Sequence, residues 1–248
     1  MKKLICTCLA ALLLCLPVGA LAADTVPVLL YHHVAEDYAE EDSIVTITPQ
    51  RFEEHLQALL AAGYTPVSFS EYYKGQLPEK PIIITFDDGY ESNYLYAYPL
   101  LQKYGVKAAI FAVVSTVGEN PNGKPHFTWE QAREMEQSGL VQIESHTLSH
   151  AGLTACDPVQ LQRELRYSKY LLDTNLNKNC TVLAYPYGYY TDEISAAAAQ
   201  AGYTIQCRVG NKGANPAAYD GGVLTRITTF GSWTGEELLW RISESTAL

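Results

Sequence analysis

Positive charge is scarce in this sequence of 248 residues, where 17 lysines and arginines face 27 aspartates and glutamates, for a formal net charge of −10. An acidic surface repels polyanions, so we expect no nucleic acid among its partners. Internal repeats and low-complexity stretches are also missing. The composition, 48% hydrophobic and 18% charged, is that of a globular protein with one sizeable core.

Cysteine is rare after residue 23: only Cys156, Cys180 and Cys207 occur in that part of the sequence. Three cysteines allow at most one internal disulfide, and their spacing is not that of a zinc knuckle. We therefore expect the fold to depend on its hydrophobic core rather than on disulfides. Long apolar runs are missing from the same region, which predicts a mature chain without a transmembrane span.

The first 23 residues differ from the rest of the chain. Lys2 and Lys3 precede an apolar run at 4–16, and a small-x-small end, Ala-Leu-Ala-Ala, follows at 20–23. This pattern is typical of a secretory signal peptide, with cleavage expected near Ala22 or Ala23. Its removal leaves 15 basic and 27 acidic residues, a net charge of −12, in an exported single domain at 24–248.

Apolar segments of strand length alternate with segments of helical periodicity along the mature chain. The strands are expected at 26–34, 82–86, 108–114, 141–144, 182–185 and 204–208. The helices are expected at 49–63, 68–74, 94–104, 128–138, 157–176 and 191–202. Strands that are apolar throughout and separated by helices predict an α/β fold with a mainly parallel sheet. About seven such units could close into a barrel.

Two of these strands end in side chains that can do chemistry, at the position where parallel α/β folds place their sites. Asp87 and Asp88 directly follow the strand at 82–86, although an Asp–Gly turn would explain the same residues. His146 and His150 follow the strand at 141–144. Their spacing places both on one face of a helical turn, where they could hold a metal or belong to a solvated turn.

A third strand ends in an aromatic turn at 185–188, Tyr-Pro-Tyr-Gly, which taken alone is compatible with a structural loop. The three clusters together are more specific than any one. Two imidazoles and a carboxylate suit Zn²⁺ or a similar divalent ion such as Ni²⁺, Co²⁺ or Fe²⁺. Three protein ligands rather than four indicate a catalytic site that leaves room for water.

The same motifs carry a resemblance to a known family. With its segments 85–89, 146–150 and 185–188 in this order, the sequence resembles the polysaccharide deacetylases (carbohydrate esterase family 4, the NodB-homology domain). The resemblance spans about 26–226 and implies a distorted, incomplete (β/α) barrel with a divalent metal at its mouth. It also implies that Asp88, His146 and His150 bind the metal and that Asp87 is the catalytic base.

These residue types permit hydrolysis of an acetyl group. A metal lowers the pKa of bound water, and Asp87, beside the metal but not on it, can accept the water's proton. The backbone N–H of Tyr187 is a candidate donor to the developing oxyanion. Tyr90, Tyr185 and Pro186 are expected to contact the substrate.

The acid that protonates the leaving amine is a first departure from the family pattern. Many members take it from a histidine near the C-terminus, but no histidine follows the second motif here. The segment 30–34, Leu-Tyr-His-His-Val, is similar to the opening of the deacetylases of biofilm poly-N-acetylglucosamine, which implies His32 as the acid with His33 as the alternative. His55 is expected at the edge of the core, and His126 in a solvent-facing loop.

A second departure is a missing arginine. Ala184 stands where the family's third motif has an arginine that orients the catalytic aspartate. Another cation would have to fill that role. Arg163, Arg166 and Arg226 are candidates, and Arg226, at a strand end, is preferred.

The predicted function is that of a secreted, monomeric, metal-dependent hydrolase, most simply a zinc enzyme, that removes N-acetyl groups from an N-acetylglucosamine-containing polysaccharide. A peptidoglycan deacetylase or an O-acetyl polysaccharide esterase would use the same residues. A catalytically inactive glycan-binding protein is the alternative from another class. The free carboxylate of Asp87 beside a metal triad argues against that alternative, while the missing arginine argues for it.

Overall fold

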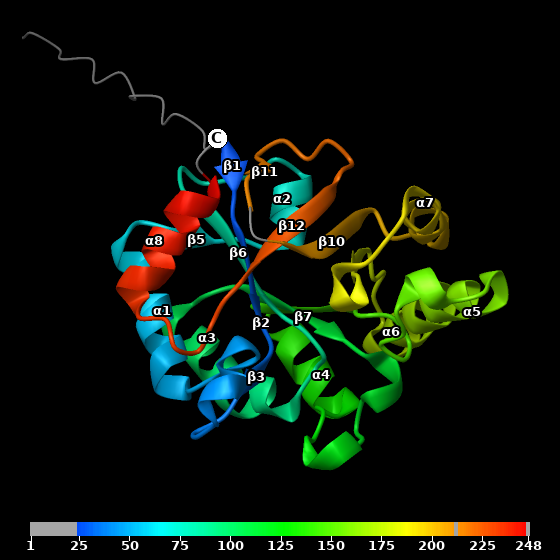
Figure 1. Ribbon diagram of the computed structural model, residues 1–248, viewed down its shortest axis with the longest axis horizontal. Coiled ribbons are helices and arrows are strands. Elements are labelled where there is room, and N and C mark those ends of the chain that lie inside the picture. Colours follow the sequence, from blue (N-terminus) through cyan, green and yellow to red (C-terminus); the bar gives the residue numbers. More distant parts are fainter. Residues whose placement is uncertain (1–23, 211–212, 247–248) are drawn as a thin grey trace, which may run out of the picture.

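The computed structural model describes residues 24–210 and 213–246, so the expected signal peptide at 1–23 lies outside the described residues. Seven parallel strands form a closed ring in the order β2-β12-β10-β9-β8-β7-β6, with β6 pairing back to β2 (Figure 1). These strands are β2 (Val28–Tyr31), β6 (Pro81–Phe86), β7 (Ala108–Ala112), β8 (Val141–Ser145), β9 (Val182–Ala184), β10 (Ile205–Gly210) and β12 (Val223–Thr228). The predicted α/β barrel is confirmed, and it is incomplete in having fewer than eight strands.

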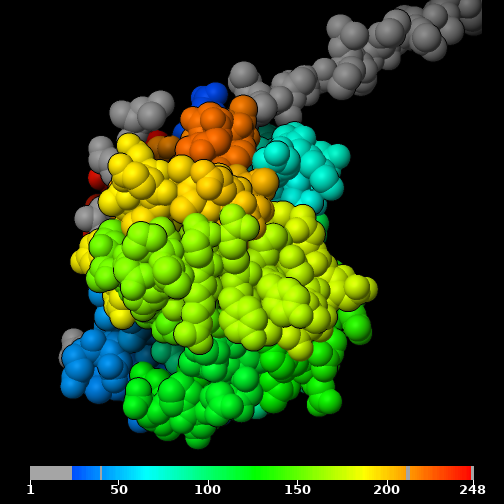
Figure 2. Space-filling model, turned by 90° about the vertical axis from the view of Figure 1, so that its right-hand side faces the viewer, coloured from blue at the N-terminus to red at the C-terminus, as the bar shows by residue number. Residues whose placement is uncertain are grey.

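Helices surround the ring: α8, α1 and α3 lie on one side in Figure 1, and α5, α6 and α7 on the other. Seen from that second side, the yellow-green segment that contains α5 and α6 covers the face of the molecule (Figure 2). The helices are α1 (Pro49–Ala61), α2 (Phe69–Tyr73), α3 (Tyr98–Tyr104), α4 (Trp129–Gln137), α5 (Pro158–Gln162), α6 (Ser168–Leu176), α7 (Asp192–Ala201) and α8 (Gly235–Thr246). None of the helices in the described part of the chain has the length and apolar character needed to cross a membrane.

The sequence placed most helix starts correctly because their caps are local. Thr48 accepts a hydrogen bond from the backbone N–H of Arg51 at the start of α1. Thr128 and Gln131 form a capping box at the start of α4. Two predicted helices are interrupted, however, by the π-helical turns η2 (Asn93–Ala97) and η6 (Arg163–Tyr167).

The expected first strand at 26–34 is in fact three short strands. After β1 (Thr25–Val26) and β2, the backbone leaves the ring at His32 and continues as β3 (His33–Val34). β1 pairs with β11 (Asn215–Pro216) and β3 with β4 (Thr46–Ile47), outside the ring. Pro27 has no N–H to donate, which limits ladder pairing at the first break. The short β5 (Thr65–Pro66) pairs with the start of β6.

Alternation along the strands divides the apolar side chains into two cores. Phe52, Leu56 and Phe86 belong to the larger core, between the ring and its helices. Ile83 and Phe111 belong to the smaller core inside the ring, which α2 closes at one end. At the opposite end, where the strands finish, polar side chains replace this apolar filling, and the predicted site lies there.

Candidate active site

The two aspartates after β6 occupy different environments. Asp87 continues the inward-facing positions of β6 and is almost fully buried, whereas the Asp88 side chain is 18% exposed. Asp88 has a φ of 72° and Gly89 a φ of 83°. A Cβ on Gly89 would lie 3.2 Å from the Phe127 ring and 3.3 Å from the Cα of Ala112, so the tight turn after Asp88 requires glycine.

Asp88, His146 and His150 bring one carboxylate oxygen and two imidazole nitrogens within 4.8 Å of one another. Asp88 Oδ1 lies 3.7 Å from His146 Nε2 and 3.6 Å from His150 Nε2. These separations are too long for hydrogen bonds, but they suit donors that share one cation at about 2.0–2.2 Å from each. The structure thus assembles the three predicted ligands into a possible metal site.

The hydrogen bond made by the second ring nitrogen of His146 leaves the first nitrogen free to bind a metal. Its Nδ1 lies 2.8 Å from the carbonyl oxygen of Ala184, so Nδ1 carries the proton and Nε2 faces Asp88 with a free lone pair. Burial lowers the pKa of His146, even though the neighbouring carboxylates of Asp87 and Asp88 oppose this effect. Burial thus favours the neutral imidazole, the form that metal ligation requires.

Several residues at this end of the ring have left-handed backbone conformations. Asp88, Thr147, His150 and Tyr187 have φ values of 60–72°. Such conformations are unfavourable for residues other than glycine, and most of all for a β-branched residue such as Thr147. Strain of this kind persists only where the surroundings hold the backbone in place, and it is frequent at functional sites.

Arg226, the preferred candidate for the cation beside Asp87, contacts that carboxylate from another strand. Arg226 of β12 is fully buried and donates two parallel hydrogen bonds to Asp87, of 2.6 Å to Oδ1 and 2.7 Å to Oδ2. Burial alone would raise the pKa of Asp87, but Arg226 and then His146 outweigh it and lower this pKa to about 2. Of the three candidate arginines, Arg226 is the one in contact with Asp87; Arg166 instead bonds Gln162 on the surface.

His32 and His33 have unlike surroundings. His33 Nδ1 lies 2.9 Å from Ser92 Oγ, and its ring packs edge-on against Tyr90 at 4.9 Å. His32 is close enough to Asp87 for its charge to lower the pKa of that carboxyl. Within the described residues, the buried His32 Nδ1 has no hydrogen-bond partner. This difference favours His32 as the group that remains available for proton transfer.

The turn after β9 places Tyr187 beside the histidines. The Tyr187 side chain is exposed, and its ring lies edge-on to that of His150 at 4.7 Å. Gly188 has a φ of 75°, and a Cβ there would come within 2.9 Å of the backbone nitrogen of Val209. The turn is therefore packed directly against β10.

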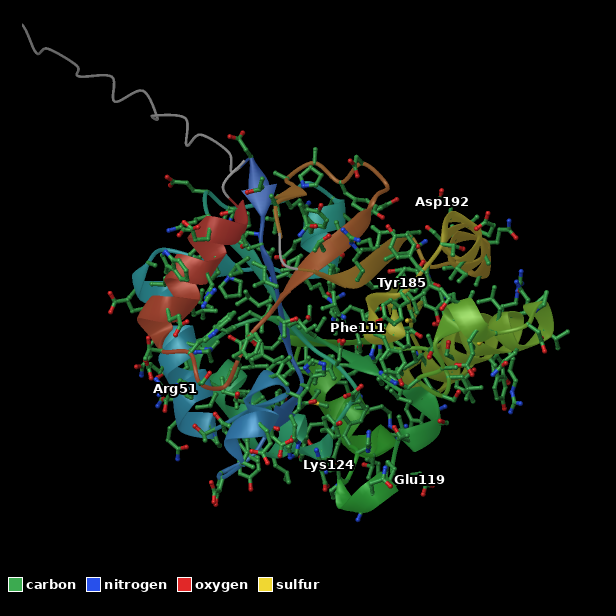
Figure 3. All side chains as sticks on the ribbon, in the orientation of Figure 1. Arg51, Phe111, Glu119, Lys124, Tyr185 and Asp192 are labelled. Atoms are coloured by element: carbon green, nitrogen blue, oxygen red, sulfur yellow. The ribbon has the colours of Figure 1, made fainter. Side chains whose placement is uncertain are left out.

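We expected Tyr185 and Pro186 to contact the substrate, but both side chains are buried. The Tyr185 hydroxyl donates to Gln206 Oε1, and its ring stacks on Tyr190 at 5.1 Å. Figure 3 shows Tyr185 and Phe111 in the interior and Asp192 at the periphery. Tyr185 therefore supports the turn that carries Tyr187 and offers no free face to a ligand.

The remaining predicted residues are placed as follows. Tyr90 is half-buried, and its ring lies 5.0 Å from that of His126. His126 is only 8% exposed, so the expectation of a solvent-facing side chain is wrong: Tyr90 covers its ring. His55 is fully buried, so it lies deeper than the edge of the core, where it was expected.

Sequence reasoning missed one buried acid next to the site. Glu164 of η6 is 3% exposed and accepts hydrogen bonds from the segment between the two histidines. A signal was present in the sequence, because Glu164 lies three positions after Leu161 and next to Leu165 on the apolar stripe of the expected helix 157–176. An acid on such a stripe needs partners.

Comparison with known proteins gives a consistent family assignment. Residues 74–206 match the sequence model of the family described as polysaccharide deacetylase. YxkH of Bacillus subtilis (strain 168), which is named as a polysaccharide deacetylase, is 38% identical over 184 residues, or 72% of this chain and 62% of that protein. The poly-beta-1,6-N-acetyl-D-glucosamine N-deacetylase of Escherichia coli (strain K12) is 35% identical over 140 residues, or 50% of this chain and 21% of that protein. The chain thus spans less than two thirds of either relative.

A solved structure agrees with this assignment. The Streptococcus pyogenes deacetylase PplD, in complex with acetate, superimposes with a TM-score of 0.78 at 30% sequence identity. The match covers 88% of this chain and 98% of that one, so the two chains share their fold over most of their length.

Proposed function

The chain belongs to the polysaccharide deacetylase family, and from this premise we propose that it is a secreted, metal-dependent hydrolase that removes N-acetyl groups from a polysaccharide containing N-acetylglucosamine. The observation that carries the proposal is the convergence of Asp88, His146 and His150 beside Asp87, whose two oxygens Arg226 holds. The choice of polymer is supported by the similarity to the E. coli relative named for poly-beta-1,6-N-acetyl-D-glucosamine. The leader at 1–23, the domain at 24–248 and a monomeric state are part of this proposal.

In the proposed mechanism, Asp88, His146 and His150 hold a divalent cation. One carboxylate and two neutral imidazoles suit Zn²⁺, although Ni²⁺, Co²⁺ and Fe²⁺ accept the same donors. When bound, the cation supplies activation of water and polarisation of the acetyl carbonyl.

The residues of the chain account for the proton transfers. Asp87 accepts the proton of the attacking water, and Arg226 keeps its carboxylate oriented and ionised. The backbone N–H of Tyr187 donates to the oxyanion that forms at the carbonyl. The amide C–N bond then breaks, His32 donates a proton to the leaving amine, and the acetyl group departs as acetate.

The test is acetate release from poly-N-acetylglucosamine, chitin oligomers, peptidoglycan and an O-acetylated polysaccharide, measured side by side. We expect the highest rate on poly-N-acetylglucosamine, loss of activity with a chelator and recovery with Zn²⁺. Preference for peptidoglycan or for O-acetyl groups would replace the substrate part of the proposal. If the metal-loaded protein releases no acetate from any of these four substrates, the proposed function as a whole is contradicted.

The Asp87→Asn variant separates an enzyme from a glycan-binding protein. Loss of the base should reduce the rate of acetate release by about 10²- to 10⁴-fold, while bound metal is retained. Asp192→Asn, at an exposed position in the first turn of α7, is the matched control and should behave as the wild type. Equal rates for the two variants would exclude Asp87 as the base.

A further inference from the structure

The segment that joins His146 to His150 is short and strained. It begins at the end of β8 and contains two left-handed residues, Thr147 with a φ of 68° and His150 with a φ of 60°. A change in either backbone angle would move one imidazole relative to the other. Something outside the segment must therefore fix its conformation.

One side of the segment is fixed by backbone donors from the turn after β7. The N–H of Val114 donates to the carbonyl of Thr147 at 3.2 Å, and that of Ser115 to the carbonyl of Leu148 at 2.8 Å. These two hydrogen bonds satisfy carbonyl groups only. The N–H groups of Leu148 and Ser149 in the same segment need an acceptor of their own.

That acceptor is Glu164. Its Oε2 accepts from the backbone N–H of Leu148 at 3.0 Å and of Ser149 at 2.9 Å, and its Oε1 accepts from the hydroxyl of Ser149 at 2.6 Å. The side chain is 3% exposed. All three partners are donors, so an ionised carboxylate, which only accepts hydrogen bonds, satisfies them together.

Glu164 is itself fixed by its own element. Its carbonyl accepts from the hydroxyl of Ser168 at 2.6 Å, and that hydroxyl also lies 3.3 Å from Ser145 Oγ, at the end of β8. Ser145 Oγ in turn accepts from the backbone N–H of Thr147 at 3.2 Å. The π-helical turn η6 and the histidine segment thus form one hydrogen-bonded unit.

We propose that Glu164 is a positioning residue: through the backbone of Leu148 and Ser149 it fixes the relative placement of His146 and His150, and so sets the affinity of the site for its metal. The inference rests on the proposed function, in which these histidines are metal ligands. Glu164 is not one of the three proposed metal ligands.

The test compares Zn²⁺ affinity by competition with a chromophoric chelator in the wild type, Glu164→Ala and Glu164→Gln. We expect Glu164→Ala to bind Zn²⁺ about 10- to 100-fold more weakly, as is usual when an outer partner of a metal ligand is removed. Glutamine retains an acceptor for the backbone N–H groups and a donor that Ser149 Oγ can accept, so it should recover most of the affinity. At saturating Zn²⁺, Glu164→Ala should also show a reduced kcat/KM.

A matched control is available at the far end of the ring. Glu71 of α2 likewise accepts from a serine, through the N–H of Ser68 at 2.9 Å and its hydroxyl at 2.8 Å. Glu71→Gln should leave Zn²⁺ affinity unchanged. A purely structural role for Glu164 would lower the melting temperature of Glu164→Ala but leave its Zn²⁺ affinity equal to that of the wild type, and that result would overturn the proposal.

The outcomes separate this inference from the proposed function. A wild-type protein that does not bind Zn²⁺ overturns both, whereas tight binding by the wild type and by Glu164→Ala alike overturns only the inference. If Glu164→Ala does not fold, Glu164→Asp decides, because its shorter side chain cannot keep both hydrogen bonds to the N–H groups of Leu148 and Ser149 at these distances. Weaker Zn²⁺ binding by Glu164→Asp supports the proposal, and unchanged binding refutes it.

Discussion

At the scale of single residues, the arginine that pairs with the proposed catalytic aspartate can lie on different strands of the ring. The resemblance predicts an arginine at position 184 on β9, but Ala184 stands there and Arg226 reaches Asp87 from β12. Both positions face the interior of the ring, where side chains from several strands meet. A cation on either strand can therefore serve the same carboxylate.

The pairing of Arg226 with Asp87 predicts a large effect on stability. Arg226→Met leaves a buried, ionised carboxylate without a partner, which should lower the free energy of unfolding by about 3–5 kcal/mol at pH 7 and strongly reduce acetate release. Arg226→Lys keeps the charge but not the two parallel hydrogen bonds, so its effect should be smaller. Urea unfolding of the metal-free protein measures both. Arg208→Met, at an exposed position, is the control, and equal stability of Arg208→Met and Arg226→Met would contradict the prediction.

The sequence predicted the site residues that directly follow a strand, together with Arg226 within β12, but it missed Glu164, which acts from a helical segment. Asp87, Asp88, His146 and His150 follow the ends of β6 and β8, so the barrel topology alone brings them to one end of the ring. Glu164 lies within a helical segment, and nothing local indicates that its carboxylate faces the histidines. The strained backbone of the site is equally hidden, because a φ value depends on tertiary contacts.

At the scale of elements, two π-helical turns each carry a buried polar residue that holds a segment of the site. Asn93, at the start of η2, is fully buried and donates to the carbonyl of His32 at 2.8 Å. Glu164 of η6 holds the histidine segment in the same way. Such turns insert one extra residue into a helix and frequently occur at functional sites. Helical periodicity predicted both helices, but an insertion of one residue is too small a change in period to be detected.

His55 links α1 to β2 and to the start of α8, and its burial predicts that the stability of the fold depends on pH. His55 of α1 is fully buried; its Nε2 lies 2.7 Å from the carbonyl of Trp233, just before α8, and its Nδ1 lies 3.1 Å from the hydroxyl of Tyr31 on β2. Burial lowers the pKa of His55, although Trp233 and Glu54 oppose this effect. The unfolded chain therefore binds a proton more readily than the folded one, and stability must fall as the pH drops below about 6.5.

The His55→Gln variant tests this link. It should be less stable than the wild type at pH 7.5, by about 1–2 kcal/mol, because one of two buried hydrogen bonds is weakened or lost. Its free energy of unfolding should also decline less steeply between pH 6.5 and 5. Urea unfolding of the metal-free proteins across this range gives both quantities. Parallel pH profiles for the two proteins would show that His55 does not contribute.

At the scale of the whole molecule, the sequence predicted the class of fold better than its closure. Uninterrupted apolar strands between helices indicated a parallel barrel of about seven units. The closing pairs of β2 with β6 and with β12 join segments far apart in the chain, and local pattern cannot specify such pairs.

One junction of the ring has little backbone pairing: β8 and β9 pair only at Ser145 and Leu183. The buried Glu144 carboxylate instead accepts hydrogen bonds from the N–H groups of residues 181 and 182.

The packing of the ring also determines how the cysteines react. Cys180 and Cys207 are fully buried, and Cys156 is half-buried; none of the three is paired in the described part of the chain. Burial raises the pKa of the Cys207 thiol to about 12 and that of Cys180 well above its usual value. Because the thiolate is the reactive form, both should be inert in the folded protein.

A titration of the chain from residue 24 with a disulfide reagent at pH 8 tests this packing. We expect at most one thiol to react in the folded state, that of Cys156, slowly because burial raises its pKa as well. All three should react in guanidinium chloride. Cys156→Ser should abolish the native reaction and leave two thiols in denaturant. A single reactive thiol in denatured wild-type protein would reveal a disulfide, and two or more rapidly reacting thiols in the folded state would show that the ring opens far more easily than its core predicts.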